Sequence, residues 1–565
     1  MRDTHPDGDL RALRARWRQV RGSQQAPQLT VGVLASYTAD PLVPYLGMAL
    51  HRAGLAASVE VGPANQITQQ CLDDSGGFAR SRPDVLVVAP RLTELGPVSA
   101  RRGWVEELVG VVEAASAAAR WWGSCLLVVL PEIPDRRPEG VGDAADPGGV
   151  VAAATAAREA VRQLLAGRPN VLVADAEEAV RRVGLARAFH PAMFRYARVP
   201  YTEELYARLG DQLGRIIALR HARRHRVVVL DGDALLAVDV SPDRTGAAGT
   251  QALDAVTALR EPLLQLHAAG LRVALRGSPG RVALGPLVTA FPELLRDLAP
   301  GWAVDRRPAR DQVRALAADA DELAGAVAVI TTDPLLADDL GSRQHDARTV
   351  VLAGEPEEWP AQLLASGLFD RLPDPDAGDP DAGARPLAPG RPPPVTAATG
   401  PAAAMSLADY VAGLDVRLEI RPAPVDRLAD IAELVARAKD FTLGRPSDLT
   451  DLAAGLDGLL AVTIRDRLAD YGLGAAVRMR LLDGAVGVVD LFSVSCPVLA
   501  KGVEAAVLAE LVGRAGRAGC DRLTVTARDT GVNGSALRFL GEAAGRDWSA
   551  VAGRPLRLDV TIERG

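Results

Sequence analysis

Residues 226–240, RVVVLDGDALLAVDV, place four apolar residues directly before two aspartates that are one residue apart. A short β-branched run of this kind predicts a buried strand, and Gly232 between Asp231 and Asp233 permits a tight turn at its end. In open α/β sheets, the residues that follow the carboxyl ends of the strands line the ligand crevice. The stretch therefore predicts a parallel-sheet strand that ends in an acid pair at a candidate site.

Further short apolar runs alternate with helical patterns on both sides of this stretch. Strands that alternate with helices in this way predict parallel sheets covered on both faces. Before residue 226 we expect strands over 28–37, 57–62, 83–90, 124–132 and 170–176. After it we expect strands over 271–278, 327–333 and 348–354, and helices over 261–270 and 282–297.

The C-terminal part of the sequence has a different pattern. Residues 371–405 are crowded with Pro, Gly, Ala and Asp and have no periodicity, which is typical of a linker. Beyond them, mixed strands and amphipathic helices predict an α+β fold. The predicted organisation is a polar arm over 1–27, one doubly wound α/β domain over 28–220, a second over 221–371, a linker over 372–405 and an α+β domain over 406–565.

The composition limits the classes of function. The chain has 565 residues, of which 24% are charged, and a formal net charge of -7, so we expect no nucleic-acid partner. Its N-terminus lacks the apolar core of a signal peptide, and no apolar run of about 18 residues predicts a membrane span. The four cysteines are scattered without a CxxC pair, so we expect a cytoplasmic protein with reduced thiols.

Several stretches, in their order and spacing, resemble the FkbH-like family. They are SYTADPLVPYLGMALHRAG (36–54), CLDDSGGFARSRPDVLVVA (71–89), VVVLDGDAL (227–235), GLFDRL (367–372), SLADYVAGLDVRLEIRPA (406–423), DFTL (440–443), IRDRLADYGLGAA (464–476) and VDLFSVSCPVLAKGVE (489–504). The resemblance covers nearly the whole chain. It implies an SGNH-hydrolase-like domain, a haloacid-dehalogenase (HAD) type phosphatase domain and a GNAT-like acyltransferase domain, in that order.

The resemblance also implies a pathway and partners. In that family, the HAD domain takes a glyceryl group from 1,3-bisphosphoglycerate, releases the phosphate and passes the acyl group to an acyl carrier protein of polyketide or nonribosomal-peptide biosynthesis. For this chain it implies an acyl or peptidyl carrier protein and a small acyl donor as partners. Two Arg-rich stretches, 11–22 and 215–226, are expected to be solvated helix faces, which would attract an acidic carrier protein.

For the HAD-like domain, the resemblance implies Asp231 as nucleophile and Asp233 as general acid, with Mg²⁺ held by the same carboxylates. The family's Cys-Ser-Lys-Asn motif is missing, and Ser278 is the candidate that remains for its phosphate-binding hydroxyl. The lysine that neutralises the phosphorylated aspartate has Arg307 or Arg310 as its best equivalent.

The metal-binding acids of the last HAD motif are replaced by threonines in the stretch Ile330 to Pro334, which leaves Asp333 as a single displaced carboxylate. One carboxylate suits a hard divalent cation poorly, because Mg²⁺ requires several oxygen ligands. We therefore predict a degenerate phosphatase site, in which the acid pair survives and the other motifs have drifted. The alternative from the residues alone is that DGD is only a polar turn at a strand end.

For the GNAT-like domain, the resemblance implies that backbone amides in residues 497–502 hold CoA or phosphopantetheine. Here the first motif position is Pro497 and the central glycine is Ala500, and Leu540 stands near the position of a tyrosine acid. Either pantetheine binding remains, or these residues simply begin a buried helix. The remaining binding candidates are Lys501, Gly502 and Asn533.

For the SGNH-like domain, Ser36 follows a predicted strand in the position of that fold's nucleophile, and His190 is the candidate histidine. Because no adjacent histidine or carboxylate is visible in the sequence, a helix-capping role for Ser36 is the simpler interpretation. The sequence thus leaves three functions open: acyl loading or transfer on a carrier protein, a catalytically silent scaffold that binds a carrier protein or partner enzyme, and an SGNH-type esterase.

Overall fold

The computed structural model describes residues 10–23, 26–221, 227–235, 245–268, 270–278, 302–319, 327–341, 348–372, 406–445, 447–482 and 486–563. The predicted helix over 282–297 and nearly all of the predicted linker over 372–405 lie outside the described residues. The chain divides into two compact units: unit 1 comprises Met1–Met48, Ala56–Leu213 and Gly390–Gly565, and unit 2 comprises Ala49–Leu55 and Gly214–Pro389.

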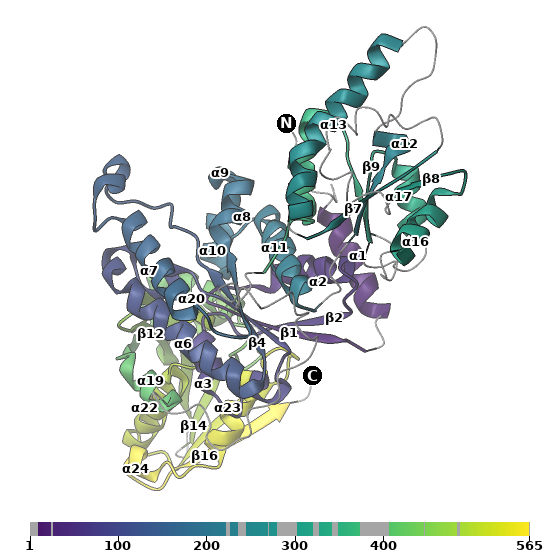
Figure 1. Cartoon of the computed structure of the whole chain (residues 1–565). Helices are drawn as coiled ribbons and strands as arrows, with labels where there is room; N and C mark the ends of the chain where they lie inside the picture. The colour runs from purple at the N-terminus through teal and green to yellow at the C-terminus, as the bar shows by residue number, and fades with distance from the viewer. Residues whose placement is uncertain are drawn as a thin grey trace. The chain divides into compact units, whose positions relative to one another are not determined.

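The first sheet, in unit 1, is fully parallel, with the strand order β2-β1-β3-β4-β5 (Figure 1). Its strands are β1 (Leu29–Ala35), β2 (Ala57–Val61), β3 (Val85–Ala89), β4 (Cys125–Leu130) and β5 (Val171–Asp175). The helices of this part are α1 (Leu10–Ser23), α2 (Val43–Arg52), α3 (Ile67–Leu72), α4 (Gly77–Ser81), α5 (Leu92–Leu95), α6 (Trp104–Trp122), α7 (Val150–Leu165), α8 (Ala176–Val183), α9 (Leu185–Ala188), α10 (Pro191–Ala197) and α11 (Glu203–His221).

Both faces of this sheet are buried, as a doubly wound fold requires. Leu86 and Val128 point to one face and join a hydrophobic cluster with α6 and α7 that includes Trp104. Their neighbours Val87 and Leu127 point to the opposite face and are fully buried too. The predicted parallel sheet and its covered faces are therefore confirmed for this part of the chain.

The sheet of unit 2 is also fully parallel, with the strand order β10-β9-β6-β7-β8 (Figure 1). Val228 and Leu230 pack against one set of helices, and Val227 and Val229 against another, so this sheet is doubly wound as well. Its strands are β6 (Val227–Asp231), β7 (Arg272–Gly277), β8 (Trp302–Val304), β9 (Val327–Thr331) and β10 (Arg348–Val351), and its helices are α12 (Gly232–Leu235), α13 (Thr245–Ala268), α16 (Ala309–Asp319), α17 (Pro334–Gly341) and α18 (Trp359–Ser366).

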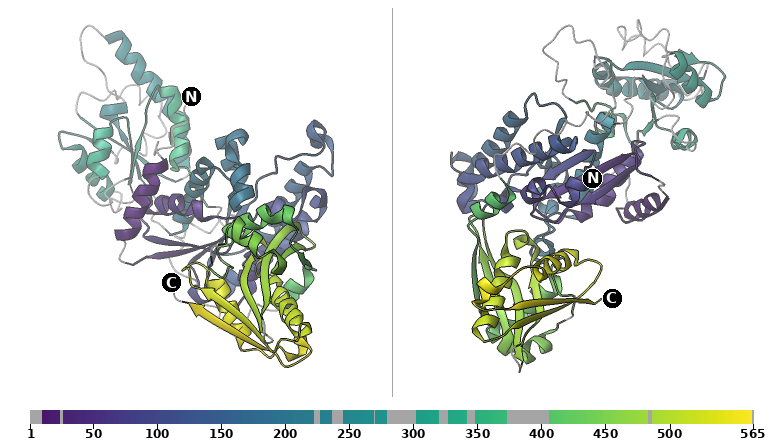
Figure 2. Two further views of the ribbon diagram at one scale, coloured as in Figure 1. Left: turned by 180° about the vertical axis from the view of Figure 1, so that it is seen from behind. Right: turned by 90° about the horizontal axis from the view of Figure 1, so that it is seen from below.

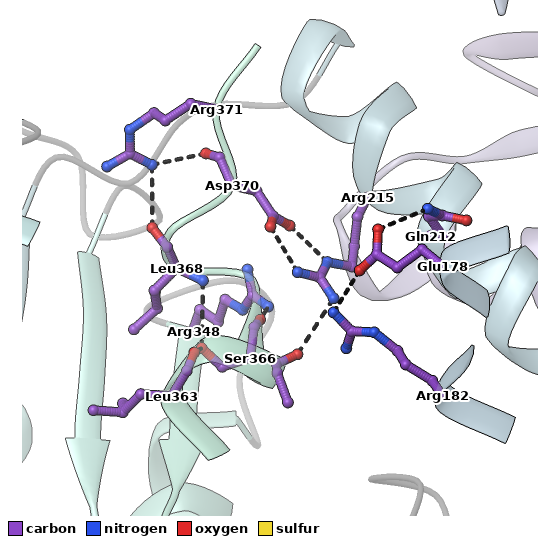
Figure 3. Close-up of polar contacts among 11 residues, drawn as sticks. Glu178, Arg182, Gln212, Arg215, Arg348, Leu363, Ser366, Leu368, Asp370 and Arg371 are labelled. Atoms are coloured by element: carbon purple, nitrogen blue, oxygen red, sulfur yellow. Dashed lines mark hydrogen bonds and ion pairs between the residues drawn. The ribbon is translucent and has the colours of Figure 1, made fainter. Parts of the chain in front are cut away.

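In unit 2, an arginine–carboxylate pair joins α11 to the segment that follows α18 (Figure 3). Arg215 in α11 donates from Nε and Nη2 to the two carboxylate oxygens of Asp370, and both distances are 2.6 Å. Asp370 lies after α18, where Gly367 adopts a φ of +82°. A Cβ at Gly367 would lie 3.0 Å from Arg215 Nε, so the close approach of this pair requires glycine there.

The third sheet, in unit 1, has the strand order β11-β12-β13-β14-β15-β16, with antiparallel pairs up to β14 and parallel pairs from β14 to β16. This part of the chain is coloured green to yellow in Figure 2. This mixed sheet confirms the predicted α+β fold of the C-terminal part. The strands are β11 (Arg417–Pro422), β12 (Leu459–Arg465), β13 (Asp470–Leu482), β14 (Val486–Val494), β15 (Arg522–Arg528) and β16 (Arg557–Glu563), and the helices are α19 (Leu407–Gly413), α20 (Leu428–Arg437), α21 (Leu449–Ala454), α22 (Val503–Arg517), α23 (Gly534–Ala544) and α24 (Ser549–Ala552).

Alternate residues of β13 enter two separate cores. Val477 joins a cluster that includes residues of α22 and α23, whereas Ala476 joins a cluster with α20 and α21. The period of two along the strand therefore buries both faces of the third sheet. In the described part of the chain, no helix combines the length and the apolar character needed to cross a membrane.

At Gly210, α11 packs closely against α2. A Cβ at Gly210 would lie 2.6 Å from Tyr45 Cβ and 2.8 Å from the backbone nitrogen of Leu46 in α2. Because backbone atoms block it, we expect Gly210→Ala to destabilise the fold by about 1–3 kcal/mol. Gly110, inside α6, has no atom within 4 Å of the position that a Cβ would take, so Gly110→Ala should be neutral or stabilising by up to about 1 kcal/mol. Urea-unfolding midpoints of both variants check this, and an equal effect of the two would contradict it.

Candidate functional site

The acid pair of unit 2 is held by an arginine from the neighbouring strand. Asp231 ends β6, Asp233 lies in the one-turn helix α12, and Arg276 of β7 is the direct register partner of Asp231. Arg276 Nη1 donates to Asp231 Oδ1 and Arg276 Nη2 to Asp233 Oδ2, both at 2.6 Å. Asp231 is 1% exposed and Arg276 is 6% exposed, so the guanidinium bridges the two carboxylates inside the protein.

The remaining carboxylate oxygens also accept hydrogen bonds from the chain. Thr331, at the end of β9, donates through its hydroxyl to Asp231 Oδ2 at 2.6 Å. Ser278, directly after β7, donates its backbone N–H to Asp233 Oδ1 at 2.7 Å and its hydroxyl to Asp233 Oδ2 at 2.8 Å. Every oxygen of the pair therefore has a donor supplied by the protein, and Ser278 is bonded to the acid pair.

Gln312 of α16 fixes the orientation of the arginine. Its Oε1 accepts a hydrogen bond from Arg276 Nε at 3.0 Å, and its Nε2 donates to the carbonyls of Gly277 and Asp305, also at 3.0 Å. Gln312 is 1% exposed. The guanidinium is thus held from both sides, by the acid pair and by a buried amide.

Two other predicted residues of this domain lie beside that network: the Asp333 N–H donates to Thr331 Oγ1 at 2.9 Å, and Asp305, the partner of Arg307, accepts from Gln312 Nε2. Asp333 accepts a hydrogen bond from the Leu335 backbone N–H at 2.9 Å, at the start of α17. Arg307, a candidate replacement for the family's lysine, is exposed and pairs with Asp305 at 2.6 Å. The structure therefore brings Asp231, Asp233 and Ser278 together and gives Asp333 and Arg307 local partners.

The electrostatics of Asp231 reflect its burial. Desolvation raises the pKa of its carboxyl, and the hydrogen bond from Thr331 and the charge of Arg276 partly offset that rise. The nearby charge of Asp233 raises it further. Arg276 is the group that makes two adjacent carboxylates tolerable at this depth.

The residues present do not fit Mg²⁺. Mg²⁺ requires near-octahedral oxygen coordination and usually keeps several waters. Here an arginine lies between the two acids, and threonines stand at the acid positions of β9. Within the described residues, no three or more His, Cys, Asp or Glu side chains gather as a metal site would require.

In the C-terminal part, residues 497–502 form the loop before α22, which we call the cradle loop. Its backbone turns sharply, with a φ of +58° at Ala500 and +78° at Gly502. A helix N-terminus of this kind favours an anion. The carboxylate of Glu504, in the first turn of α22, takes that role, because it accepts the Ala500 N–H at 2.9 Å. Burial raises the pKa of the Glu504 carboxyl, and the Ala500 N–H partly offsets the rise.

Lys501 points into the protein. Its Nζ donates to Asp466 Oδ2 at 2.7 Å and contacts the hydroxyl of Tyr471, and its side chain is 3% exposed. Burial lowers the pKa of Lys501, while the Asp466 carboxylate acts in the opposite direction. The ammonium group is thus engaged by the chain itself.

Asn533, the third binding candidate, is fully buried. Its Nδ2 donates to the carbonyls of Thr442 and Arg528, and its Oδ1 accepts the Thr530 N–H. Its polar atoms therefore hold the loop between β15 and α23. The side chains of Lys501 and Asn533 therefore already have partners within the chain.

Ser36, directly after β1, belongs to a buried ionic network. Its Oγ accepts the backbone N–H of Arg91 at 2.8 Å, and Arg91 Nε donates to Glu132 Oε1 at 2.6 Å. Tyr201 donates to the other oxygen of Glu132 at 2.7 Å. His190 instead caps α10, where its Nδ1 accepts the Met193 N–H at 3.3 Å. In the described part of the chain, no hydrogen bond joins Ser36 to His190 as a catalytic pair would require.

The first and third sheets are joined by polar contacts inside unit 1. Asn65 Nδ2 donates to the carbonyl of Pro497 in the cradle loop at 3.4 Å. Arg437 Nη1 donates to the carbonyl of Arg195 at 3.0 Å, and Arg467 forms an ion pair with Glu107. The cradle loop therefore packs next to the residues that follow the strands of the first sheet.

The comparisons with known proteins show the fold and no family. No family model matches the chain, and no curated protein matches it in sequence. The N-terminal part of the protein BF1531 from Bacteroides fragilis, which contains a phosphatase domain and is complexed with Mg, aligns at 13% identity with a TM-score of 0.51, over 64% of this chain and 98% of that chain. That likeness shows a shared fold.

Two further solved structures align weakly. Rv2747 from Mycobacterium tuberculosis, in complex with CoA, has 17% identity and a TM-score of 0.16 over 19% of this chain and 63% of that chain. A fungal glucosamine N-acetyltransferase region has 11% identity and a TM-score of 0.14 over 89% of this chain and 61% of that chain. Neither score is high enough to carry an argument about this chain.

Arg276, Gln312 and Glu504 are the residues of these sites that were not predicted from the sequence. Arg276 carries a visible signal, since it is a charged residue inside the apolar strand RVALRG, next to the acid pair's strand. Buried strands rarely contain an unpaired charge, so a carboxylate partner could have been sought. Glu504 carries only the weaker signal of an acidic residue in a first helical turn.

We expect the buried carboxyl of Glu504 to make stability depend on pH. Its pKa is raised above the ordinary value of 4.5, so the folded state binds the proton more tightly than the unfolded state. Stability is therefore lost as the pH rises from that value through the folded-state pKa. Glu504→Gln keeps an acceptor for the Ala500 N–H and should raise the melting temperature at neutral pH but not near pH 4. The exposed control Glu542→Gln should change it at neither pH, and a neutral-pH loss in Glu504→Gln would contradict this account.

Proposed function

We propose that this protein is an FkbH-like partner of an acyl or peptidyl carrier protein in polyketide or nonribosomal-peptide biosynthesis, and that it binds the carrier without turning over a phosphate ester. The sequence resemblance supports the pathway, and the shared fold with a phosphatase-containing protein is consistent with it. The choice of binding over phosphoryl transfer rests on the acid pair. An aspartate nucleophile needs an open approach, whereas Asp231 is buried and bonded to Arg276 and Thr331.

The observation that carries the docking part of the proposal is the arginine face of α1. This helix, LRALRARWRQVRGS, contains five arginines and no acidic residue. Its apolar side is anchored, because Leu13 and Trp17 are buried and the Trp17 ring lies against Gly47 of α2. The arginines, which are all exposed, are Arg11, Arg14, Arg16, Arg18 and Arg21.

A fixed basic helix suits an acidic carrier protein for two reasons. Opposite charge steers the diffusional encounter and raises the association rate. The rigid anchoring of α1 by Trp17 means that the arginines are presented without the cost of ordering a segment on binding. The contact is expected to be transient, since exposed charges act mainly on rate and are screened by salt.

Acyl transfer by the C-terminal part and ester hydrolysis by Ser36 receive less support. Leu540, near the position of the family-type tyrosine acid, is fully buried and apolar, and Glu504 occupies the anion cradle. Ser36 accepts a hydrogen bond from Arg91, and His190 caps a helix. A scaffold that binds a carrier protein is therefore preferred over both.

Charge reversal of the helix tests the docking proposal. The variant Arg16→Glu/Arg18→Glu/Arg21→Glu should weaken binding to a purified holo acyl carrier protein by about tenfold or more at low salt, mainly through a slower association rate. The control Arg538→Glu/Arg546→Glu/Arg554→Glu changes the net charge equally at exposed positions of the C-terminal part. Surface plasmon resonance at two salt concentrations measures both. Equal weakening in the two variants, or no complex with the unmodified chain, would refute docking on α1.

Turnover is tested separately by intact-mass spectrometry of the carrier. We expect no glyceryl adduct after incubation of the holo carrier with the protein, Mg²⁺ and 1,3-bisphosphoglycerate generated in place, because the acid pair is closed by Arg276. An adduct that disappears in Asp231→Asn would show that the HAD-like site is an active acyl-loading enzyme. Carrier binding without an adduct is the result that the proposal requires.

A further inference from the structure

We propose that Arg276 is a built-in replacement for the divalent cation of a phosphatase-type acid pair, so that unit 2 keeps its fold without metal and contains a latent metal site that the guanidinium fills. This inference goes beyond the carrier-binding function and does not depend on it. It rests on the position of one side chain between two carboxylates.

Arg276 lies where it can bridge both acids. In the parallel register of β6 and β7, Asp231 and Arg276 are direct partners, and both side chains leave the carboxyl edge of the sheet. The two terminal nitrogens of the guanidinium reach one oxygen of Asp231 and one of Asp233 at the same distance of 2.6 Å. A single cationic group thus bridges both acids, as a metal ion shared by two carboxylates would.

The acid pair needs a positive charge nearby. Two carboxylates held close together in a low-dielectric site repel each other and cannot both ionise without a nearby positive charge. Asp231 is 1% exposed, so water supplies little screening there. In the described residues, Arg276 is the cationic side chain that contacts both acids. The charge that a metal supplies elsewhere therefore comes here from the chain itself.

The shape of the guanidinium also suits the two acids. A planar guanidinium presents parallel N–H donors in a fixed fork, whereas an ammonium group is a point charge. Gln312 accepts from the third nitrogen of Arg276 at 3.0 Å and so fixes the plane of the fork. Thr331, where the phosphatase motif has an acid, donates to Asp231 and adds no negative charge. While Arg276 is in place, every carboxylate oxygen of the pair has a donor from the chain, so the acid pair has no open oxygen for a hydrated cation.

The experiment measures Mn²⁺ and Mg²⁺ binding by the full chain. Equilibrium dialysis should find no bound Mn²⁺ in the unmodified protein, and millimolar Mg²⁺ should leave its melting temperature unchanged. Arg276→Ala should lower the melting temperature, and Mn²⁺ or Mg²⁺ should restore part of the loss by occupying the vacated space. The rescue should vanish in Arg276→Ala/Asp231→Asn, which removes one of the two acids.

A matched control exists in the same unit. Arg215→Ala breaks another pair in which one guanidinium holds a carboxylate through two bonds of 2.6 Å, but here both bonds go to one acid, Asp370 (Figure 3). Metal should not rescue that variant. Arg276→Lys keeps a positive charge, and it should be insensitive to metal too.

Two results would overturn the inference. One is binding of about one Mn²⁺ by the unmodified chain that is lost in Asp231→Asn, because the site would then hold metal despite Arg276. The other is a folded Arg276→Ala variant that gains no metal response. If Arg276→Ala does not fold, metal binding by the unmodified chain and by Arg276→Lys still decides the question, with Arg215→Ala as the control. Bound metal in the unmodified chain or in Arg276→Lys would contradict the proposal.

Discussion

The ion pair between Arg276 and the two aspartates is the constraint on which the carboxyl edge of the second sheet depends. It joins β6 to β7 through their register, and Gln312 extends the same network to α16 and to the residues after β8. Removing one member would leave a buried charge without its partner, which costs far more than the pair contributes in net stability. The loss of either the acids or the arginine alone would therefore be costly, so the pair has a structural reason to persist that does not depend on its chemistry.

In unit 1, a side chain of the chain itself also takes the place of a charged ligand, but there the side chain is acidic. At the cradle loop, an acidic side chain, Glu504, satisfies a backbone amide that an external anion would otherwise bind. Behind the loop, Lys501 is neutralised by Asp466. At the acid pair, Arg276 thus takes the place of a cation, and at the loop before α22, Glu504 takes the place of an anion. A bound ligand would have to displace an internal partner, so affinity for phosphate-bearing small molecules is expected to be low at both places.

The strands could be predicted from the sequence, but the partners of the acid pair could not. Runs such as VVVL before Asp231 predict a buried parallel strand because apolar residues and the turn that follows are local signals. The position of Asp231 and Asp233 at the strand end followed from the same run. The roles of Arg276 and Ser278 could not be read in this way, because they depend on which strands are neighbours and on the register between them. Phosphate binding by Ser278 stays a prediction, and in the structure its donors are directed to Asp233.

The arginine face of α1 follows a different rule from the buried pairs. A buried charge is fixed by its partner, whereas the exposed arginines of α1 contribute little to the stability of the fold, because surface ion pairs are worth about 0–1 kcal/mol. The buried side chains of Leu13 and Trp17 anchor the helix, and Arg14 also pairs with Glu203 at 2.9 Å. Folding alone therefore does not account for five exposed arginines and no acid on this helix, and the proposed carrier protein would supply a reason for that composition. At the two candidate sites, the buried charges are paired within the chain. Recognition of a partner by charge would therefore have to use exposed residues such as the arginines of α1.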